Sequence, residues 1–138
     1  MEFQRNTKRK GARMEAKKEK SCADLVRSEW LIREEQLERF EADGWRNFHE
    51  FGLGFDYVEP NTFKGQTRGY WRFQMSWGGP SDEIRFYTTG SYPNMQQVLD
   101  SAEYWYMDWF DGAKESVTDA HIIPDLWDYL METIYIPD

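Results

Sequence analysis

The chain has 138 residues, of which 40% are apolar and 17% aromatic, and it carries 17 Lys and Arg against 25 Asp and Glu, a formal net charge of −8. This length fits one domain, and seven Trp, eight Tyr and nine Phe supply a core, which excludes a wholly disordered chain. No run of about 18 apolar residues occurs, so we expect no membrane-spanning helix. The single cysteine, Cys22, excludes an intrachain disulfide, and no apolar signal-peptide segment follows the basic start, so we expect a cytoplasmic protein.

The charges divide the chain into two parts of opposite sign. Residues 1–20 hold eight Lys and Arg against three Glu, whereas residues 21–138 hold nine Lys and Arg against 22 Asp and Glu. Because the first part is almost without apolar residues, we predict a basic arm, partly disordered or forming the start of a helix. We predict that residues 21–138 form a single acidic domain. Its negative field repels nucleic acid and attracts basic surfaces.

A long N-terminal helix is the first predicted element. From Arg13 to Asp43 the sequence contains neither Gly nor Pro and is rich in Ala, Lys, Glu, Arg and Leu, which favour helix. An apolar stripe at helical spacing runs along it, through Val26, Trp30, Leu37 and Phe40. We expect the helix to end at Gly44, which can adopt the left-handed conformation of a helix cap.

The middle of the chain changes from an irregular connection to alternating strands. Residues 45–68 are aromatic but broken by glycines, with room for a short strand at 55–58. From Gly69 the period becomes two, which predicts a half-buried strand with Trp71, Phe73, Met75 and Trp77 facing the core. A turn at 78–81 then leads into a second strand, whose Ile84 and Phe86 join the same core.

The last part of the chain predicts one more strand and a final helix. The third strand covers about Val98 to Trp109 and ends at Asp111-Gly112. Apolar residues at helical spacing predict the last helix over residues 118–134, or from Pro124 if this proline lies in the first turn. The predicted fold class is therefore α+β, with a long N-terminal helix, a three- to four-stranded antiparallel meander sheet and a C-terminal helix.

Residues for nucleophilic catalysis are scarce. Only two histidines occur, His49 and His121, and neither lies near a Ser or Cys motif. Cys22, which we expect on the exposed or boundary face of the first helix, has no defined base beside it. The same shortage of Cys and His spacing argues against zinc. We predict a protein that is not an enzyme and holds no metal or cofactor.

Carboxylates are plentiful and leave a metal-dependent enzyme open as an alternative. Its site would use Asp82, Glu83, Glu103 and Asp108. Strand alternation is expected to place Asp108 and Asp111 on opposite faces of the sheet unless a bulge intervenes. We therefore predict that the strand carboxylates cap turns, at 78–81 and 112–113, by accepting backbone N–H bonds.

Aromatic and cationic residues alternate on the other face of the predicted hairpin. Tyr70 and Arg72, with Arg85 and Tyr87 on the next strand, offer a surface on which nucleic-acid bases can stack. The acidic charge of the domain opposes phosphate binding, and we expect most aromatic side chains to lie in the core.

Two segments carry a family resemblance. They are W-G-G-P-S-D-E at 77–83 and E-Y-W-x-x-D-W-F-D-G-A at 103–113, within a match of roughly residues 70–113. This pattern resembles small proteins carried by bacteriophages, plasmids and other mobile elements. The resemblance implies a compact α+β domain in the bacterial cytosol and a task in the conflict between mobile element and host, and it supplies no catalytic residue.

Acidic charge and the resemblance together suggest a leading hypothesis. The protein is expected to inhibit or modulate a host defence protein that handles nucleic acid, in the manner of an anti-CRISPR or anti-restriction protein, by presenting an acidic surface to a basic partner. No single helix can imitate DNA, because acids four residues apart recur about every 6 Å whereas duplex DNA carries a charge per roughly 1.7 Å. The acids of both helices must therefore act together with those of the strands, and the predicted partner-binding residues are Glu34, Glu38, Glu41, Asp125, Asp128 and Glu132.

The basic arm supports an alternative hypothesis, a nucleic-acid-associated accessory protein. Its phosphate contacts would come from Arg5, Lys8, Arg9, Lys10, Arg13 and Lys17. The sequence leaves the oligomeric state open.

Overall fold

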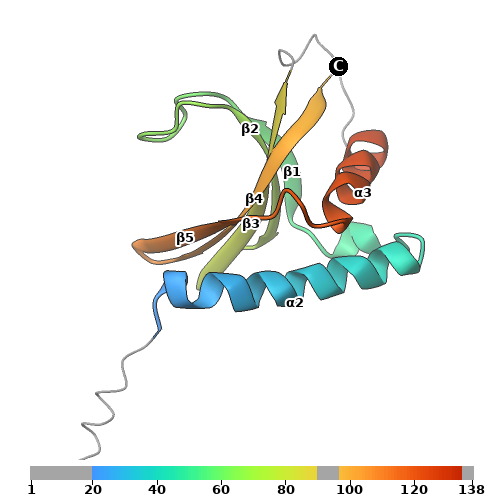
Figure 1. Ribbon diagram of the computed structural model, residues 1–138, viewed down its shortest axis with the longest axis horizontal. Helices are drawn as coiled ribbons and strands as arrows, with labels where there is room; N and C mark the ends of the chain where they lie inside the picture. Colours follow the sequence, from blue (N-terminus) through green and yellow to red (C-terminus); the bar gives the residue numbers. More distant parts are fainter. Residues whose placement is uncertain (1–19, 90–96, 135–138) are drawn as a thin grey trace, which may run out of the picture.

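The computed structural model describes residues 20–89 and 97–134, which form an α+β fold (Figure 1). Its helical elements are α2 (Cys22–Ala42), a 3₁₀ turn η1 (Phe48–Glu50), α3 (Ile122–Tyr129) and a π-helical turn η2 (Leu130–Ile134). Its strands are β1 (Gly54–Val58), β2 (Tyr70–Ser76), β3 (Pro80–Thr89), β4 (Val98–Asp108) and β5 (Asp111–Ser116). They form one antiparallel sheet in the order β1-β2-β3-β4-β5, which confirms the predicted meander between two helices.

Helix α2 begins with a capping box. The Ser21 side chain accepts a bond from the Asp24 N–H, and the Asp24 carboxylate accepts one from the Ser21 N–H. Lys20 and Ser21 are not helical, so a helix running without interruption from Arg13 is wrong, while residues 1–19 lie outside the described ranges. The predicted end is confirmed, since Gly44 follows the helix with a φ of +68°.

Within the described residues the sheet has five strands rather than the three or four predicted. The possible strand at 55–58 exists as β1, and Asp111-Gly112 starts β5 instead of ending the third strand. The chain reverses through Trp109 and Phe110, with Trp109 in the left-handed region at φ 58° and Asp108 paired with Asp111. Because paired residues of a hairpin share a face, the expectation that Asp108 and Asp111 lie on opposite faces is wrong.

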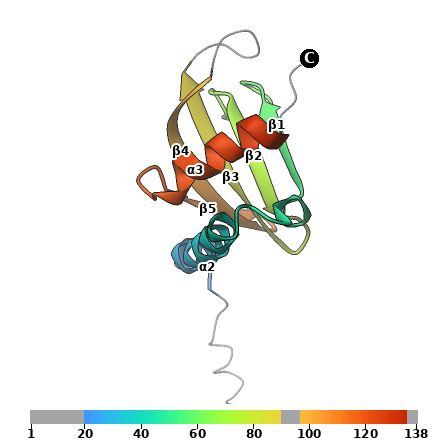
Figure 2. The ribbon, with the colours of Figure 1, turned by 90° about the vertical axis from the view of Figure 1, so that its right-hand side faces the viewer.

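Both helices cover the same face of the sheet (Figure 2). Helix α3 crosses this face, while α2 lies along one end of it and contacts β4, β5 and α3. Large aromatic pairs join the layers, such as Trp30 with Tyr104 at 5.4 Å and Phe86 with Trp127 at 5.3 Å between ring centroids. The core therefore lies between the helices and one sheet face.

The alternation predicted for the first hairpin is confirmed for five of its six core residues. These buried residues are Trp71, Phe73, Met75, Ile84 and Phe86. Trp77 is an error of the prediction, because its side chain is 75% exposed. The pairing of β2 with β3 shifts between Gln74 and Ser76, and β2 ends at Ser76, so the period of two does not continue to Trp77.

The last helix is shorter than predicted. Helix α3 begins at Ile122, so Pro124 is its third residue and lies in the first turn, where the ring removes no helical hydrogen bond. After Tyr129 the backbone continues as η2. Buried Ile122, Ile123 and Leu126 form the inner side of α3, as the apolar spacing indicates.

Candidate functional site

Acidic side chains of α2 and α3 meet where the two helices pack together. Glu34, Glu38 and Glu41 lie half-buried on α2, and His121, just before α3, places its Nδ1 3.6 Å from Glu38 Oε2. Glu41 lies beside Asp125 of α3, and a hydrogen bond between them, together with burial, raises the pKa of Glu41 above its usual range. The two helices thus bring two carboxyl groups into contact.

Asp128 and Glu132 extend this surface along α3 and η2. Both are exposed, and their spacing of three and seven residues from Asp125 puts them on the same side of the helix. After Lys114 the sequence contains no further Lys or Arg. We call Glu34, Glu38, Glu41, Asp125, Asp128 and Glu132 together the acidic helix surface.

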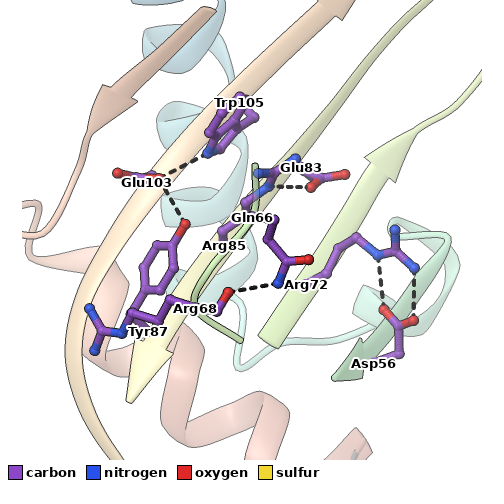
Figure 3. A network of polar contacts seen from close by, with 9 residues as sticks. All are labelled: Asp56, Gln66, Arg68, Arg72, Glu83, Arg85, Tyr87, Glu103 and Trp105. Atoms are coloured by element: carbon purple, nitrogen blue, oxygen red, sulfur yellow. Dashed lines mark hydrogen bonds and ion pairs between the residues drawn. The ribbon is translucent and has the colours of Figure 1, made fainter. Parts of the chain in front are cut away.

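The opposite face of the sheet, which none of the described helices covers, carries a network of cations, carboxylates and aromatic rings (Figure 3). At its centre Arg85 donates from Nε to Glu83 Oε2 at 2.6 Å. The Arg85 guanidinium lies 3.8 Å from the ring centroid of Trp105 and 4.5 Å from that of Tyr70. Glu83 is buried to 4% exposure, so the pair is held inside the network rather than in solvent.

Glu103 of β4 joins further side chains to this network. We call the whole set the open-face network, and its members are Tyr70, Glu83, Arg85, Tyr87, Glu103, Trp105 and Lys114. Its carboxylate accepts bonds from the Tyr87 hydroxyl and from Trp105 Nε1, both at 3.0 Å, and lies 3.3 Å from Lys114 Nζ on β5. Burial, followed by the nearby charge of Glu103, raises the pKa of Tyr87 to about 12. Tyr87 therefore stays a hydrogen-bond donor at neutral pH.

The predicted stacking surface is only partly present. Tyr87 is partly exposed and Arg85 lies in the network, but Tyr70 is 1% exposed, so its assignment to an exposed platform is wrong. The ring is covered by Arg85 and lies 5.9 Å from the ring of Tyr87. Arg72 is held at the edge by Asp56, with Nε–Oδ1 3.0 Å and Nη2–Oδ2 2.8 Å.

The four carboxylates of the metal-enzyme alternative do not come together. Asp82 faces the helices, where it is bound by Arg33, whereas Glu83 and Glu103 belong to the open-face network. Within residues 20–89 and 97–134, no group of three or more His, Cys, Asp or Glu side chains is placed to hold a metal ion. Asp108 pairs with Asp111 at the tip of the β4–β5 hairpin.

The prediction that Asp82 and Asp111 cap turns by accepting backbone N–H bonds at 78–81 and 112–113 is also wrong, because their hydrogen bonds come from other residues. Among the described residues, the donors to Asp82 are all side chains, including the Ser76 and Tyr104 hydroxyls at 2.7 and 2.6 Å. Asp111 accepts from the Cys22 N–H at 2.7 Å and so ties the start of α2 to β5. Cys22, expected at a boundary, is buried, and burial followed by Asp111 raises the pKa of its thiol.

The basic arm and His49 complete the residues that were named from the sequence. The basic-arm residues Arg5, Lys8, Arg9, Lys10, Arg13 and Lys17 lie outside the described ranges. His49 is exposed, 3.8 Å from Glu50. None of the described helices has the length and apolarity needed to cross a bilayer.

Two parts of the open face were not singled out from the sequence. One is β5 with Lys114, and the other is the loop between β1 and β2, residues 59–69, with Lys64, Gln66 and Arg68. Apolar residues do not recur at a regular spacing in the loop. The feature of its sequence that could have indicated a site is its local excess of Lys and Arg over Asp and Glu. Comparison with known proteins finds no matching family model, no matching curated protein and no matching solved structure.

Proposed function

We propose that this protein is a non-enzymatic inhibitor or modulator that docks its acidic helix surface on a basic, nucleic-acid-binding protein of a host defence system, as an anti-CRISPR or anti-restriction protein does. The observation that carries the proposal is the contact of Glu41 with Asp125. Two carboxyl groups in contact oppose folding when both are ionised, and a cost to stability of this kind is one that proteins accept where function requires it.

The geometry supports a surface rather than a single charged helix. Glu34, Glu38 and Glu41 follow one another at three- and four-residue steps on α2, and α3 crosses the direction of α2 so that Asp125 lies beside Glu41 (Figures 1 and 2). The second helix adds carboxyl groups next to the end of this row, which raises the local negative charge above what one helix offers. A cationic groove that binds phosphates is the complementary partner.

Charge reversal tests the proposal in cells. Asp125→Lys, Asp128→Lys and Glu132→Lys are introduced together, and the protection of incoming DNA is measured in bacteria that carry a CRISPR or restriction system. We expect the variant to fold and to lose protection, because all three side chains are exposed and their repulsion by a cationic partner replaces attraction. Full protection by the folded variant would contradict the proposal.

A matched control separates the surface from the net charge. Glu35, Glu50 and Glu59 are exposed and lie outside the acidic helix surface, so Lys at these positions gives the same change in total charge. We expect this control to protect as well as the original chain. The same triple change at Glu34, Glu38 and Glu41 asks whether α2 shares the surface, and we expect it to do so.

The accessory-protein alternative is distinguished in the same assay. Gln in place of the six cations of the basic arm that are predicted to contact phosphate removes these contacts and leaves the acidic helix surface unchanged. If the accessory role holds, this variant loses function, whereas acidic docking predicts unchanged or increased protection.

A further inference from the structure

A cavity of ≈ 450 Å³ lies on the open face of the sheet, between the loop of residues 59–69 and strands β3, β4 and β5. Figure 1 shows this loop projecting from the side of the sheet opposite α3. Its volume falls in the range of about 300–1,000 Å³ that is typical of small-molecule sites. The acidic helix surface is on the other side of the sheet, so this cavity is a separate feature.

Every charged side chain that lines the cavity is a cation. They are Lys64 and Arg68 from the loop, Arg85 from β3 and Lys114 from β5, and among the described residues no carboxylate lines it. Three of these cations have an acidic partner that does not line the cavity: Glu83 lies 2.6 Å from Arg85, Glu103 3.3 Å from Lys114 and Asp100 3.2 Å from Arg68. In a chain of net charge −8, four converging cations favour an anionic ligand.

Aromatic side chains lie beside these cations. Tyr87 and Trp105 line the cavity, and Phe63, 49% exposed, lines it from the loop. The guanidinium groups of Arg68 and Arg85 lie over the rings of Tyr87 and Trp105, at 4.9 and 3.8 Å (Figure 3). Aromatic rings and guanidinium planes are the groups on which nucleic-acid bases stack.

We propose that this cavity binds a nucleotide unit, with its phosphate at Arg68 and Lys114 and its base stacked on Phe63 and the neighbouring planes. The unit comes either as a free mononucleotide or as part of a single strand, since both present the same phosphate and ring.

The loop wall is built by one side chain. Gln66 Oε1 accepts from the Thr62 and Phe63 N–H groups at 2.9 and 3.0 Å, and Nε2 donates to the Glu59 and Arg68 carbonyl oxygens at 3.0 and 2.7 Å. All four polar sites of the amide are used within the loop, so Gln66 is a positioning residue that leaves ligand contacts to its neighbours. It holds Phe63 and Arg68 on the same wall.

Calorimetric titration of the full chain tests the proposal. The probes are the four ribonucleoside 5′-monophosphates, adenosine, inorganic phosphate and a short single-stranded DNA. We expect at least one monophosphate to bind about tenfold or more tightly than adenosine or phosphate alone, because only it engages the cations and the rings together. Tighter binding of the single strand than of any monophosphate identifies the strand as the source of the unit, and equal binding identifies the free nucleotide.

Exposed lining residues supply variants that keep the fold. Arg68→Gln with Lys114→Gln should weaken binding by about tenfold or more, and Phe63→Ala by about fivefold or more. Their matched controls are Arg39→Gln in α2 with Arg46→Gln just after it, and Leu53→Ala; all three residues are exposed and none lines the cavity. We expect these controls to bind as the original chain does.

Three results would overturn the proposal. One is the absence of binding by every monophosphate and by the single strand, and another is phosphate binding as tightly as the monophosphates. The third is strand binding that survives both lining variants, which assigns it to cations elsewhere in the chain. The acidic-surface variants change none of these outcomes, so this proposal and the proposed function fail independently.

Discussion

Arg33 of α2 and Asp82 of β3 form a two-point ion pair across the core boundary, with Nε–Oδ2 2.7 Å and Nη2–Oδ1 3.1 Å. Their side chains are only 19% and 3% exposed. The Asp82 carboxylate also accepts from the Ser76 and Tyr104 hydroxyls, so it joins α2, β2, β3 and β4 at one point. Burial and then this bond raise the pKa of Tyr104, which stays a donor.

Asp82→Ala should lower the free energy of unfolding by about 3–5 kcal/mol, because it leaves the Arg33 charge and the Tyr104 hydroxyl without their shared acceptor. Urea unfolding measures the change. The control is Asp56→Ala, which breaks the more exposed pair with Arg72 and should cost about 1 kcal/mol or less. Similar costs for the two variants would show that the buried pair has no special structural role.

The Tyr70 hydroxyl offers the reverse case. It is buried, has no hydrogen-bond partner among the described residues, and burial raises its pKa. Tyr70→Phe removes an unpaired polar atom and should leave stability unchanged or raise it by up to about 1–3 kcal/mol. Tyr104→Phe removes the bond to Asp82 and should destabilise, so thermal unfolding of the two variants should shift in opposite directions. Loss of stability in Tyr70→Phe would mean that its hydroxyl has a partner.

Glu41 gives a pH-dependent prediction. Its raised pKa means that the folded protein favours the protonated carboxyl, so this stability is present at acid pH and is lost as the pH rises through the folded pKa. Glu41→Gln removes the repulsion with Asp125 and should raise the melting temperature at pH 7, with the difference disappearing at pH values where Glu41 is protonated. Glu59→Gln is the exposed control and should change little. A benefit that is constant with pH would rule out this cause.

The hairpin residues give a direct packing test. Phe73 is 3% exposed and stacks on Phe48 with 5.5 Å between ring centroids, so Phe73→Ala should cost about 3–5 kcal/mol. Trp77, 75% exposed, should tolerate replacement by Ala within about 0.5 kcal/mol. Equal losses in denaturant unfolding would contradict the observed end of β2.

These residues also show what local sequence patterns can predict. The period of two correctly placed Phe73 and Ile84 in the core, and it fails at Trp77 because a bulge near Ser76 is not visible in the alternation. Asp82 is two residues from Ile84 and therefore lies on the same face of the strand, so the period of two could have predicted its burial. Strand β5 was missed because its turn, Trp109-Phe110, lacks the glycine and asparagine that usually mark a hairpin.

The candidate sites depend on contacts between distant segments. Helical spacing predicts an acidic row on each helix, but the meeting of Glu41 with Asp125 depends on how α2 and α3 pack. The cavity needs Arg68 of the loop, Arg85 of β3 and Lys114 of β5, which only the five-stranded sheet brings together. Neither arrangement follows from a local pattern.

Capture of the host partner tests the central claim most directly. We compare the intact protein with the triple variant Asp125→Lys, Asp128→Lys, Glu132→Lys. Each is immobilised and exposed to a lysate of bacteria that carry a CRISPR or restriction system, and the proteins that bind are identified by mass spectrometry. The acidic helix surface predicts a nucleic-acid-binding defence protein that is released by salt and by competing duplex DNA, and that the variant does not retain. Retention of the same protein by the folded variant, undiminished by salt or DNA, would contradict acidic docking.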